Sequence, residues 1–221
     1  MKFAASLLTS VFVLITLCCS HVFAGGIGWE AEHTASITPP MEVGLDNNAS
    51  GGQYLFTGTS NSGLASYEFE VPKNGTYFMW AHHSSDSAGS NSFFLSIDEP
   101  TDPQGITALT WDTIPEPQPQ ARGEVVDIEG VDLYSADWLW IRVFERQDEL
   151  FNLMKIREFE LTTGGHTMYL AGREGQTKAD AFYLTDNFND QPVFPDEATG
   201  ILAVSPGKKM TTTWASVKSG Y

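Results

Sequence analysis

The sequence contains only two cysteines, Cys18 and Cys19, and both lie within its first 24 residues. From residue 25 onward there is no thiol, which excludes disulfides, cysteine-based metal sites and cysteine nucleophiles from that part. An exported domain without disulfides needs a sizeable hydrophobic core, or a metal ion, to stabilise its fold. The remaining length is sufficient for one domain with such a core.

Basic residues are also scarce. Lysine and arginine together number 12 against 28 acidic residues, which gives a formal net charge of −16. This charge argues against nucleic acid as a partner, because binding nucleic acid depends on neutralising phosphates. It also argues against anionic membranes, and it favours solubility, cation binding and neutral partners.

Motifs of the common enzyme classes are absent. The chain has no Gly-x-Ser-x-Gly elbow, no His-Glu-x-x-His, no phosphate loop and no dinucleotide fingerprint. Carboxylates are numerous, so counting alone leaves a glycosidase pair open, but no spacing singles out two of them. We therefore predict a protein that is not an enzyme.

Residues 1–24 are typical of a secretory signal peptide. Lys2 gives the positive start, residues 7–19 are almost wholly apolar, and Ala24 provides a small residue at the end. The apolar run is short for a membrane span, so a retained anchor is the less favoured alternative, as is a lipoprotein site at Cys18 or Cys19. The prediction is a secreted, periplasmic or cell-surface protein with no membrane insertion after cleavage.

Period-two alternation of apolar residues dominates the rest of the chain, and no long helical pattern occurs. Many short strands divided by Gly, Pro, Asn and Ser predict an all-β sandwich or barrel. The expected strands are 29–36, 53–58, 65–71, 76–83, 91–98, 138–144, 157–161, 165–171 and 180–185.

The predicted domain covers residues 25–187. Within it, residues 99–122 are rich in proline and acidic residues, and we expect a long loop over one end of the sandwich. Residues 188–221 are expected to form an irregular strap and a C-terminal tail. Residues 213–221 of the tail carry isolated aromatics, which suit either a docking or sorting peptide or a frayed terminus.

Three carboxylates are candidate cation ligands. Glu30 and Glu32 share one face of a strand and repel each other unless a cation or water lies between them. Asp180 alternates with Phe182 and Leu184, and a carboxylate at an apolar face must be neutralised, hydrogen-bonded or cation-bound. Calcium takes about 6–8 oxygen ligands, which these side chains and carbonyls of residues 47–52 could supply. The alternative is that Glu30 and Glu32 are surface glutamates of an acidic protein.

The stretch 137–143 carries a candidate ligand site. Alternation places the aliphatic residues Leu139, Ile141 and Val143 towards the core, and therefore Trp138, Trp140 and Arg142 on the other face. A flat indole can receive the C–H face of a sugar, while Asp137 and Arg142 can bind its hydroxyls. Trp138, nearer the strand end, is the better candidate. Alternatively, Trp140 packs under a neighbouring strand or the long loop, with Arg142 stacked on it.

Other conspicuous residues receive mostly structural predictions. Trp111, at the edge of the long loop, could form the opposite wall of the sugar site. We expect Trp80 in the core, and His82 and His83 on opposite faces of their strand, so that they do not chelate together. Arg173 and Glu174 are expected to hold a tight turn, and the alternative is that they contact a ligand hydroxyl.

Several stretches, taken in order, resemble carbohydrate-binding modules of the family 6 and family 35 type, over residues 29–187. They are Glu30-Ala-Glu32, Ala49-Ser-Gly-Gly-Gln-Tyr-Leu55, Tyr67-Glu-Phe-Glu-Val-Pro-Lys-Asn-Gly-Thr-Tyr77 with the tryptophan-containing strand that follows it, Trp138-Leu-Trp140, Gly165-His-Thr-Met168 and Gly172-Arg-Glu-Gly-Gln-Thr-Lys-Ala-Asp180. Gln176 and Ala181 depart from the usual pattern.

The resemblance implies a jelly-roll β-sandwich with one structural calcium ion, bound by Glu30, Glu32 and Asp180. It implies that the first tryptophan of the pair is the sugar platform, and that Asn187 lies where related modules place a polar residue of the sugar cleft. The expected function is non-catalytic binding of a neutral polysaccharide or oligosaccharide. The alternative is a cell-surface or extracellular structural or protein-interaction domain on the same scaffold, with a cell-surface or enzyme partner.

Overall fold

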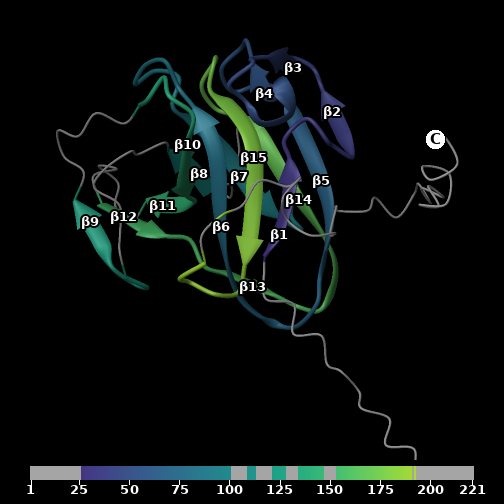
Figure 1. The fold of residues 1–221 in the computed structure, drawn as a ribbon, viewed down its shortest axis with the longest axis vertical. Coiled ribbons are helices and arrows are strands. Elements are labelled where there is room, and N and C mark those ends of the chain that lie inside the picture. Colours follow the sequence, from purple (N-terminus) through teal and green to yellow (C-terminus); the bar gives the residue numbers. More distant parts are fainter. Residues whose placement is uncertain are drawn as a thin grey trace, which may run out of the picture.

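The computed structural model describes residues 26–100, 109–112, 121–127, 134–146, 153–190 and 192. Two antiparallel sheets face each other and form a sandwich, as predicted (Figure 1). The predicted signal peptide and tail lie outside the described residues. No described segment forms a helix with the length and hydrophobicity to cross a lipid bilayer.

The larger sheet has seven strands in the order β10-β6-β15-β4-β3, with β1 also paired to β15 and β13 to β6. Its strands are β1 (Ile27–Glu30), β3 (Met41–Leu45), β4 (Gln53–Thr57), β6 (Gly75–Ser84), β10 (Leu139–Arg142), β13 (Phe159–Leu161) and β15 (Lys178–Thr185). A 3-10 turn, η1 (Ser50–Gly52), precedes β4.

The second sheet has five strands in the order β2-β5-β14-β7-β8. They are β2 (Ser36–Thr38), β5 (Leu64–Val71), β7 (Ser92–Ile97), β8 (Leu109–Asp112) and β14 (Gly164–Gly172). A small third sheet lies beside the sandwich and consists of β9 (Val125–Asp127), β11 (Phe144–Arg146) and β12 (Leu153–Ile156).

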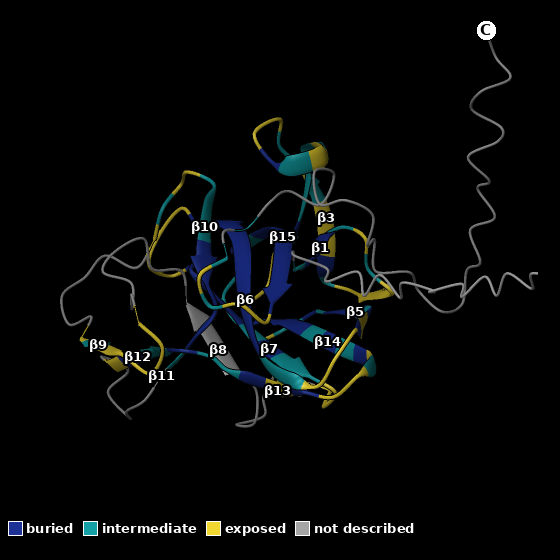
Figure 2. Cartoon of the chain, turned by 60° about the horizontal axis from the view of Figure 1, so that its bottom comes forward, coloured by how far each residue is buried: buried dark blue, intermediate teal, exposed yellow. Residues whose placement is uncertain are grey.

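The core lies between the two large sheets and follows the predicted alternation. Phe182 and Leu184 of β15 are fully buried, and Phe182 lies 5.8 Å from the ring of Trp29. Trp29 in turn stacks on Phe69 of the opposite sheet, with ring centroids 5.5 Å apart. Strands β6 and β15 are buried at the centre of the larger sheet, except at the first residues of each strand (Figure 2).

Several strand predictions were wrong. The first strand ends at Glu30 rather than continuing to residue 36, because the chain turns there, with the N–H of His33 bonded to the carbonyl of Glu30 at 3.2 Å. It then crosses to the other sheet, where β2 pairs with β5. The predicted long loop at residues 99–122 contains β8, which pairs with β7, and the prediction omitted β3, β9 and β12.

A buried histidine fastens the end of β7 to the start of β14. Nδ1 of His166 lies 2.7 Å from Oδ2 of Asp98, and its Nε2 lies 2.7 Å from the carbonyl of Thr162. Burial lowers the pKa of His166, but the bonds to Thr162 and Asp98 outweigh it and leave that pKa raised. The second carboxylate oxygen of Asp98 accepts the N–H of Thr167 at 3.0 Å.

Candidate functional site

Four rings gather on the outer face of the larger sheet, near one end. We call Tyr54, His82, Trp138 and Trp140 the aromatic cluster. Trp138 has ring-centroid distances of 5.7 Å to Tyr54 and 5.6 Å to His82, and Trp140 lies 5.1 Å from His82. Both tryptophans are half-buried, so parts of their rings face solvent.

Strand parity brings these rings together. In β10, Ile141 is fully buried in the core, so the tryptophans on either side of Leu139 point outward. Trp140 lies directly opposite His82 of β6 in the sheet register. The prediction included both tryptophans but omitted Tyr54, although its alternation with the fully buried Leu55 in β4 was a usable signal.

The polar edge of Trp138 is fixed. Its Nε1 donates to Oδ2 of Asp46 at 3.1 Å, and the other oxygen of Asp46 accepts the N–H of Asn48 at 2.9 Å. The bond from Asn48, and next the one from Trp138, lower the pKa of Asp46. An ionised acceptor therefore holds the indole by its only polar atom and leaves its ring for stacking.

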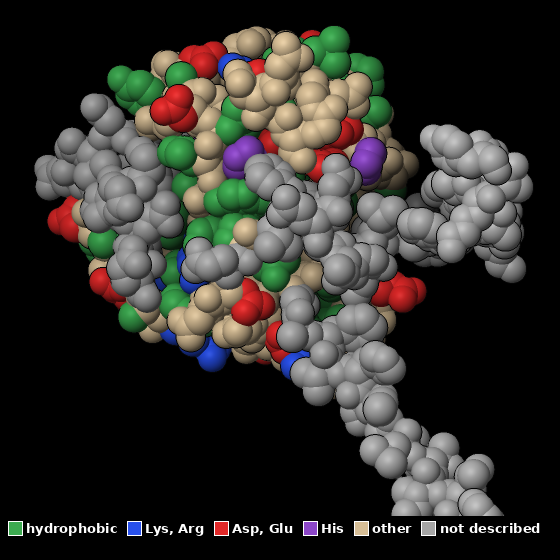
Figure 3. Space-filling model, viewed as in Figure 1, with side chains coloured by type: hydrophobic (Ala, Val, Ile, Leu, Met, Phe, Trp, Pro, Cys, Tyr) green, Lys and Arg blue, Asp and Glu red, His purple; other side chains and the backbone are tan. Residues whose placement is uncertain are grey.

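Charged groups surround the aromatic cluster. Nζ of Lys178 lies 3.1 Å from Oδ2 of Asp86 and 5.9 Å from the ring centroid of Tyr54. Asp137 is exposed next to Trp138, and its N–H donates to Oγ of Ser135 at 3.2 Å. Acidic side chains are scattered over this side of the molecule (Figure 3).

The candidate cation ligands meet around η1. Oγ of Ser50 donates to Oε1 of Glu30 at 2.7 Å, and the N–H of Ser50 donates to Oδ2 of Asp180 at 2.9 Å. A methyl group on Gly51 would come within 3.3 Å of Oε1 of Glu32. The structure thus brings all three predicted carboxylates to one turn.

The predicted orientation of Asp180 was wrong. A β-bulge shifts the register of β15 between Ala179 and Ala181. Asp180 therefore does not share the core face of Phe182, and its Oδ2 accepts a hydrogen bond from Nδ1 of His82 on the outer face. Asp180 is fully buried.

These donors suit a hard cation in their chemistry, because all are carboxylate oxygens. Oδ1 of Asp180 is buried and, among the described residues, has no hydrogen-bond partner. As placed, however, the described His, Cys, Asp and Glu side chains form no group of three arranged closely enough to hold a metal ion. The three residues thus match calcium in donor type, but their side chains as placed do not form a metal site.

Arg142 does not join the aromatic cluster. Its guanidinium lies 4.4 Å from the ring centroid of Trp80 and 4.1 Å from that of Phe188, and it donates to the carbonyl of Phe188. Burial lowers the pKa of Arg142 to about 10. Trp80 is buried, as predicted, but it lies opposite Arg142 on the outer face of the sheet. Arg142 stacks on Trp80 instead of Trp140.

Two further predicted residues lie elsewhere. Asn187 follows the far end of β15, where its side chain donates to Asp190 at 2.5 Å and accepts the N–H of Asn189 at 3.1 Å. Trp111 belongs to β8 of the other sheet, opposite Phe93. Neither is brought to Trp138 by the backbone.

The structural predictions for the turn and the histidine pair are confirmed. Arg173 binds Oγ of Ser92 and Oε1 of Glu174, and the other oxygen of Glu174 accepts the N–H of Asn91 at 2.8 Å. His83 faces away from His82 and is 1% exposed. Burial, with a smaller effect of His82, lowers the pKa of His83 to about 3.

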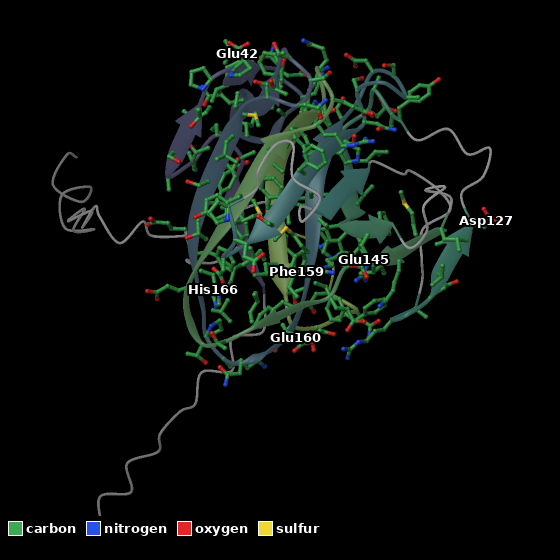
Figure 4. All side chains as sticks on the ribbon, turned by 180° about the vertical axis from the view of Figure 1, so that it is seen from behind. Glu42, Asp127, Glu145, Phe159, Glu160 and His166 are labelled. Atoms are coloured by element: carbon green, nitrogen blue, oxygen red, sulfur yellow. The ribbon has the colours of Figure 1, made fainter. Side chains whose placement is uncertain are left out.

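A cavity of about 400 Å³ lies at the opposite end of β6, next to β13. Its walls include Asp98, Glu99, Glu158 and Glu160, and its aromatic residue, Phe159, is only 7% exposed. Figure 4 shows Phe159 and Glu160 far from Glu42, which marks the end with the aromatic cluster. Without an exposed ring, this cavity is a weaker glycan site than the aromatic cluster.

No protein-family profile matches the chain, and no curated protein matches it. Solved structures with a similar arrangement include a family 35 carbohydrate-binding module from Clostridium thermocellum, with a TM-score of 0.47, 10% identity, and coverage of 74% of this chain and 100% of that one. Another is the C-terminal family 6 module of a Zobellia galactanivorans laminarinase, with a TM-score of 0.43, 14% identity, and coverage of 72% and 98%.

Enzymes are also among the similar structures. A Podospora anserina β-(1,4)-mannanase with a family 35 module gives a TM-score of 0.49 at 10% identity, and the match covers 76% of this chain and 29% of that one. An exo-β-1,3-galactanase from Phanerochaete chrysosporium is covered to 30% of its length. The chain thus spans less than a third of these two enzymes.

Proposed function

We propose that this chain is an exported, non-catalytic protein that binds a neutral polysaccharide or oligosaccharide at the aromatic cluster. The observation that carries the proposal is the state of Trp138. Its polar edge is held by Asp46 while its ring stays partly open to solvent. An aromatic ring fixed in this way loses little conformational freedom when a ligand stacks on it.

The surroundings supply the polar contacts that a sugar needs. Asp137 and Asp86 can accept hydrogen bonds from hydroxyl groups, and Lys178 can donate to them. The charge of Lys178 is balanced by Asp86, with which it pairs. The remaining carboxylates therefore leave an excess of negative charge around the rings. A negatively charged sugar would be repelled by that excess, and a neutral one would not.

The carboxylates around the cluster support a binding role. Asp46 is engaged by Trp138 and Asn48, and Asp180 by His82 and Ser50. A general acid or base must instead reach the proton of the substrate that it transfers. Asp46 and Asp180 are already bonded to protein groups, so we assign them a structural role at the binding site.

We also propose that Glu30, Glu32 and Asp180 hold a structural calcium ion. A cation there would neutralise carboxylates whose burial is otherwise costly, and it would tie β1 and η1 to β15. Chelation should then lower the melting temperature, and added calcium should restore it. An unchanged melt would remove the calcium proposal.

Binding is tested by titrating the protein with a glycan found on a broad array, using Trp138→Ala as the variant. Removing a central stacking residue typically costs about 2 kcal/mol or more, so affinity should fall about 30-fold. The matched control is Tyr169→Ala, because Tyr169 is a half-buried aromatic residue of the other sheet, between core residues Met168 and Leu170. Equal affinities for both variants would contradict the proposal.

A further inference from the structure

One side chain connects the carboxylates around η1 to the tryptophans. His82 is 6% exposed, and its Nδ1 meets Oδ2 of Asp180. These two atoms are within hydrogen-bond distance, so the contact with Asp180 orients the imidazole. On the other side, the His82 ring contacts both indoles of the aromatic cluster.

Asp180 is itself rigidly placed. Its backbone carbonyl accepts the N–H of Ala31 at 2.7 Å, and its Oδ2 also accepts the N–H of Ser50. The β-bulge next to it turns its carboxylate towards His82. The acceptor that orients the imidazole is therefore anchored by two other segments of the chain.

The orientation of the imidazole matters because both indoles pack against it. The ring planes of His82 and Trp138 are 29° apart, and those of His82 and Trp140 are 33° apart. Rotating the imidazole about its Cβ–Cγ bond would remove this near-parallel contact. Trp138 would still have its hydrogen bond to Asp46 and its ring contact with Tyr54, but not the support of the imidazole.

We propose that His82 is a positioning residue of the sugar site, which holds the Trp138 and Trp140 rings in place and is itself oriented by Asp180. A change at Asp180 should therefore alter the environment of Trp138 through His82. The predicted effect on sugar affinity rests on the proposed function, whereas the structural link does not.

The link is tested without any glycan by a double-mutant cycle of His82→Phe and Asp180→Asn. Phenylalanine keeps a ring and loses the Nδ1 donor. The readout is the near-UV circular dichroism of Trp138, taken as the difference between each protein and the same protein carrying Trp138→Phe. Asp180→Asn should change this signal in the native background and leave it unchanged beside His82→Phe. An equal change in both backgrounds, or none in either, would overturn the proposal.

A second variant keeps the test decisive if His82→Phe does not fold. His82→Asn retains a donor near the position of Nδ1 and removes the ring. We expect it to reduce the Trp138 signal, and a Trp138 signal equal to that of the native protein would show that the imidazole does not support the indole.

Sugar affinity gives the functional readout. In a protein that binds a glycan, either His82 variant should weaken binding about tenfold, roughly the loss of one good contact. If the native protein binds no glycan, the proposed function fails, while the dichroism cycle still decides the role of His82. Native affinity in both folded variants would overturn the positioning role.

Discussion

Arg142 lies between the rings of Trp80 and Phe188, which indicates a structural role, whereas its place in the sequence near Trp140 suggested ligand binding. A substitution at Arg142 distinguishes the two roles. Arg142→Met removes the charge and the planar group and keeps an apolar side chain between the two rings. The variant tests whether the guanidinium fastens residues after β15 to the outer face of the sheet, where Phe188 covers it.

The magnitude follows from opposing effects. Each of the two ring contacts is worth about 2 kcal/mol when desolvated, and the charged hydrogen bond to the Phe188 carbonyl about 1.5–3 kcal/mol. Burial lowers the pKa of Arg142 to about 10, a cost of about 3 kcal/mol at about 1.4 kcal/mol for each pKa unit. Methionine recovers part of the packing, so we expect a net loss of about 2 kcal/mol.

The assay is thermal unfolding, followed together with glycan affinity. A loss of about 2 kcal/mol corresponds to a melting temperature about 4–8 °C lower for a domain of this size. Arg142→Lys keeps the charge without the planar stack, so its melting temperature should lie between those of the native protein and Arg142→Met. An unchanged or higher melting temperature for Arg142→Met would refute the reasoning, because buried charges can be replaced by apolar groups at no cost when their burial outweighs their contacts. Weaker glycan binding at unchanged stability would restore the ligand-binding role.

Three further outcomes are expected. The pKa of His166 is raised in the folded protein, so its contribution to stability is complete below its unfolded pKa and is lost as pH rises through the folded pKa. His166→Gln should remove this pH dependence of the free energy of unfolding in urea. A pH profile that is the same in the variant and the native protein would contradict this prediction. Asp180→Asn should abolish any rise in melting temperature on adding calcium, and a preserved rise would assign the cation to other residues. Tyr54→Ala should weaken glycan binding about three- to tenfold, less than Trp138→Ala, and an effect larger than that of Trp138→Ala would move the centre of the platform to Tyr54.

The sequence predicted the sandwich because its strands alternate cleanly, as in β5, where Tyr67, Phe69 and Val71 are buried. It missed β3 because Val43 and Leu45 are exposed at a sheet edge, with Gly44 between them, so no buried face marks that strand. It misplaced Asp180 because a bulge changes parity without a sequence signal.

The aromatic cluster was predictable in part. The alternation of β10 correctly turned both tryptophans outward, but strand pairing decided which residues lie beside them. The register that sets Trp140 opposite His82, and Arg142 opposite Trp80, depends on contacts far apart in the chain. Sequence alone therefore assigned the arginine to the wrong tryptophan and left His82 without a role.

The central claim is that Trp138 is the platform of a glycan-binding site. The most direct measurement is binding of the folded protein, in calcium, to a broad glycan array, with Trp138→Ala and Tyr169→Ala measured alongside. We predict selective binding to neutral glycans that Trp138→Ala loses and Tyr169→Ala keeps. A blank array from folded protein, or binding that survives Trp138→Ala, would contradict it, and a blank array would favour the protein-interaction alternative.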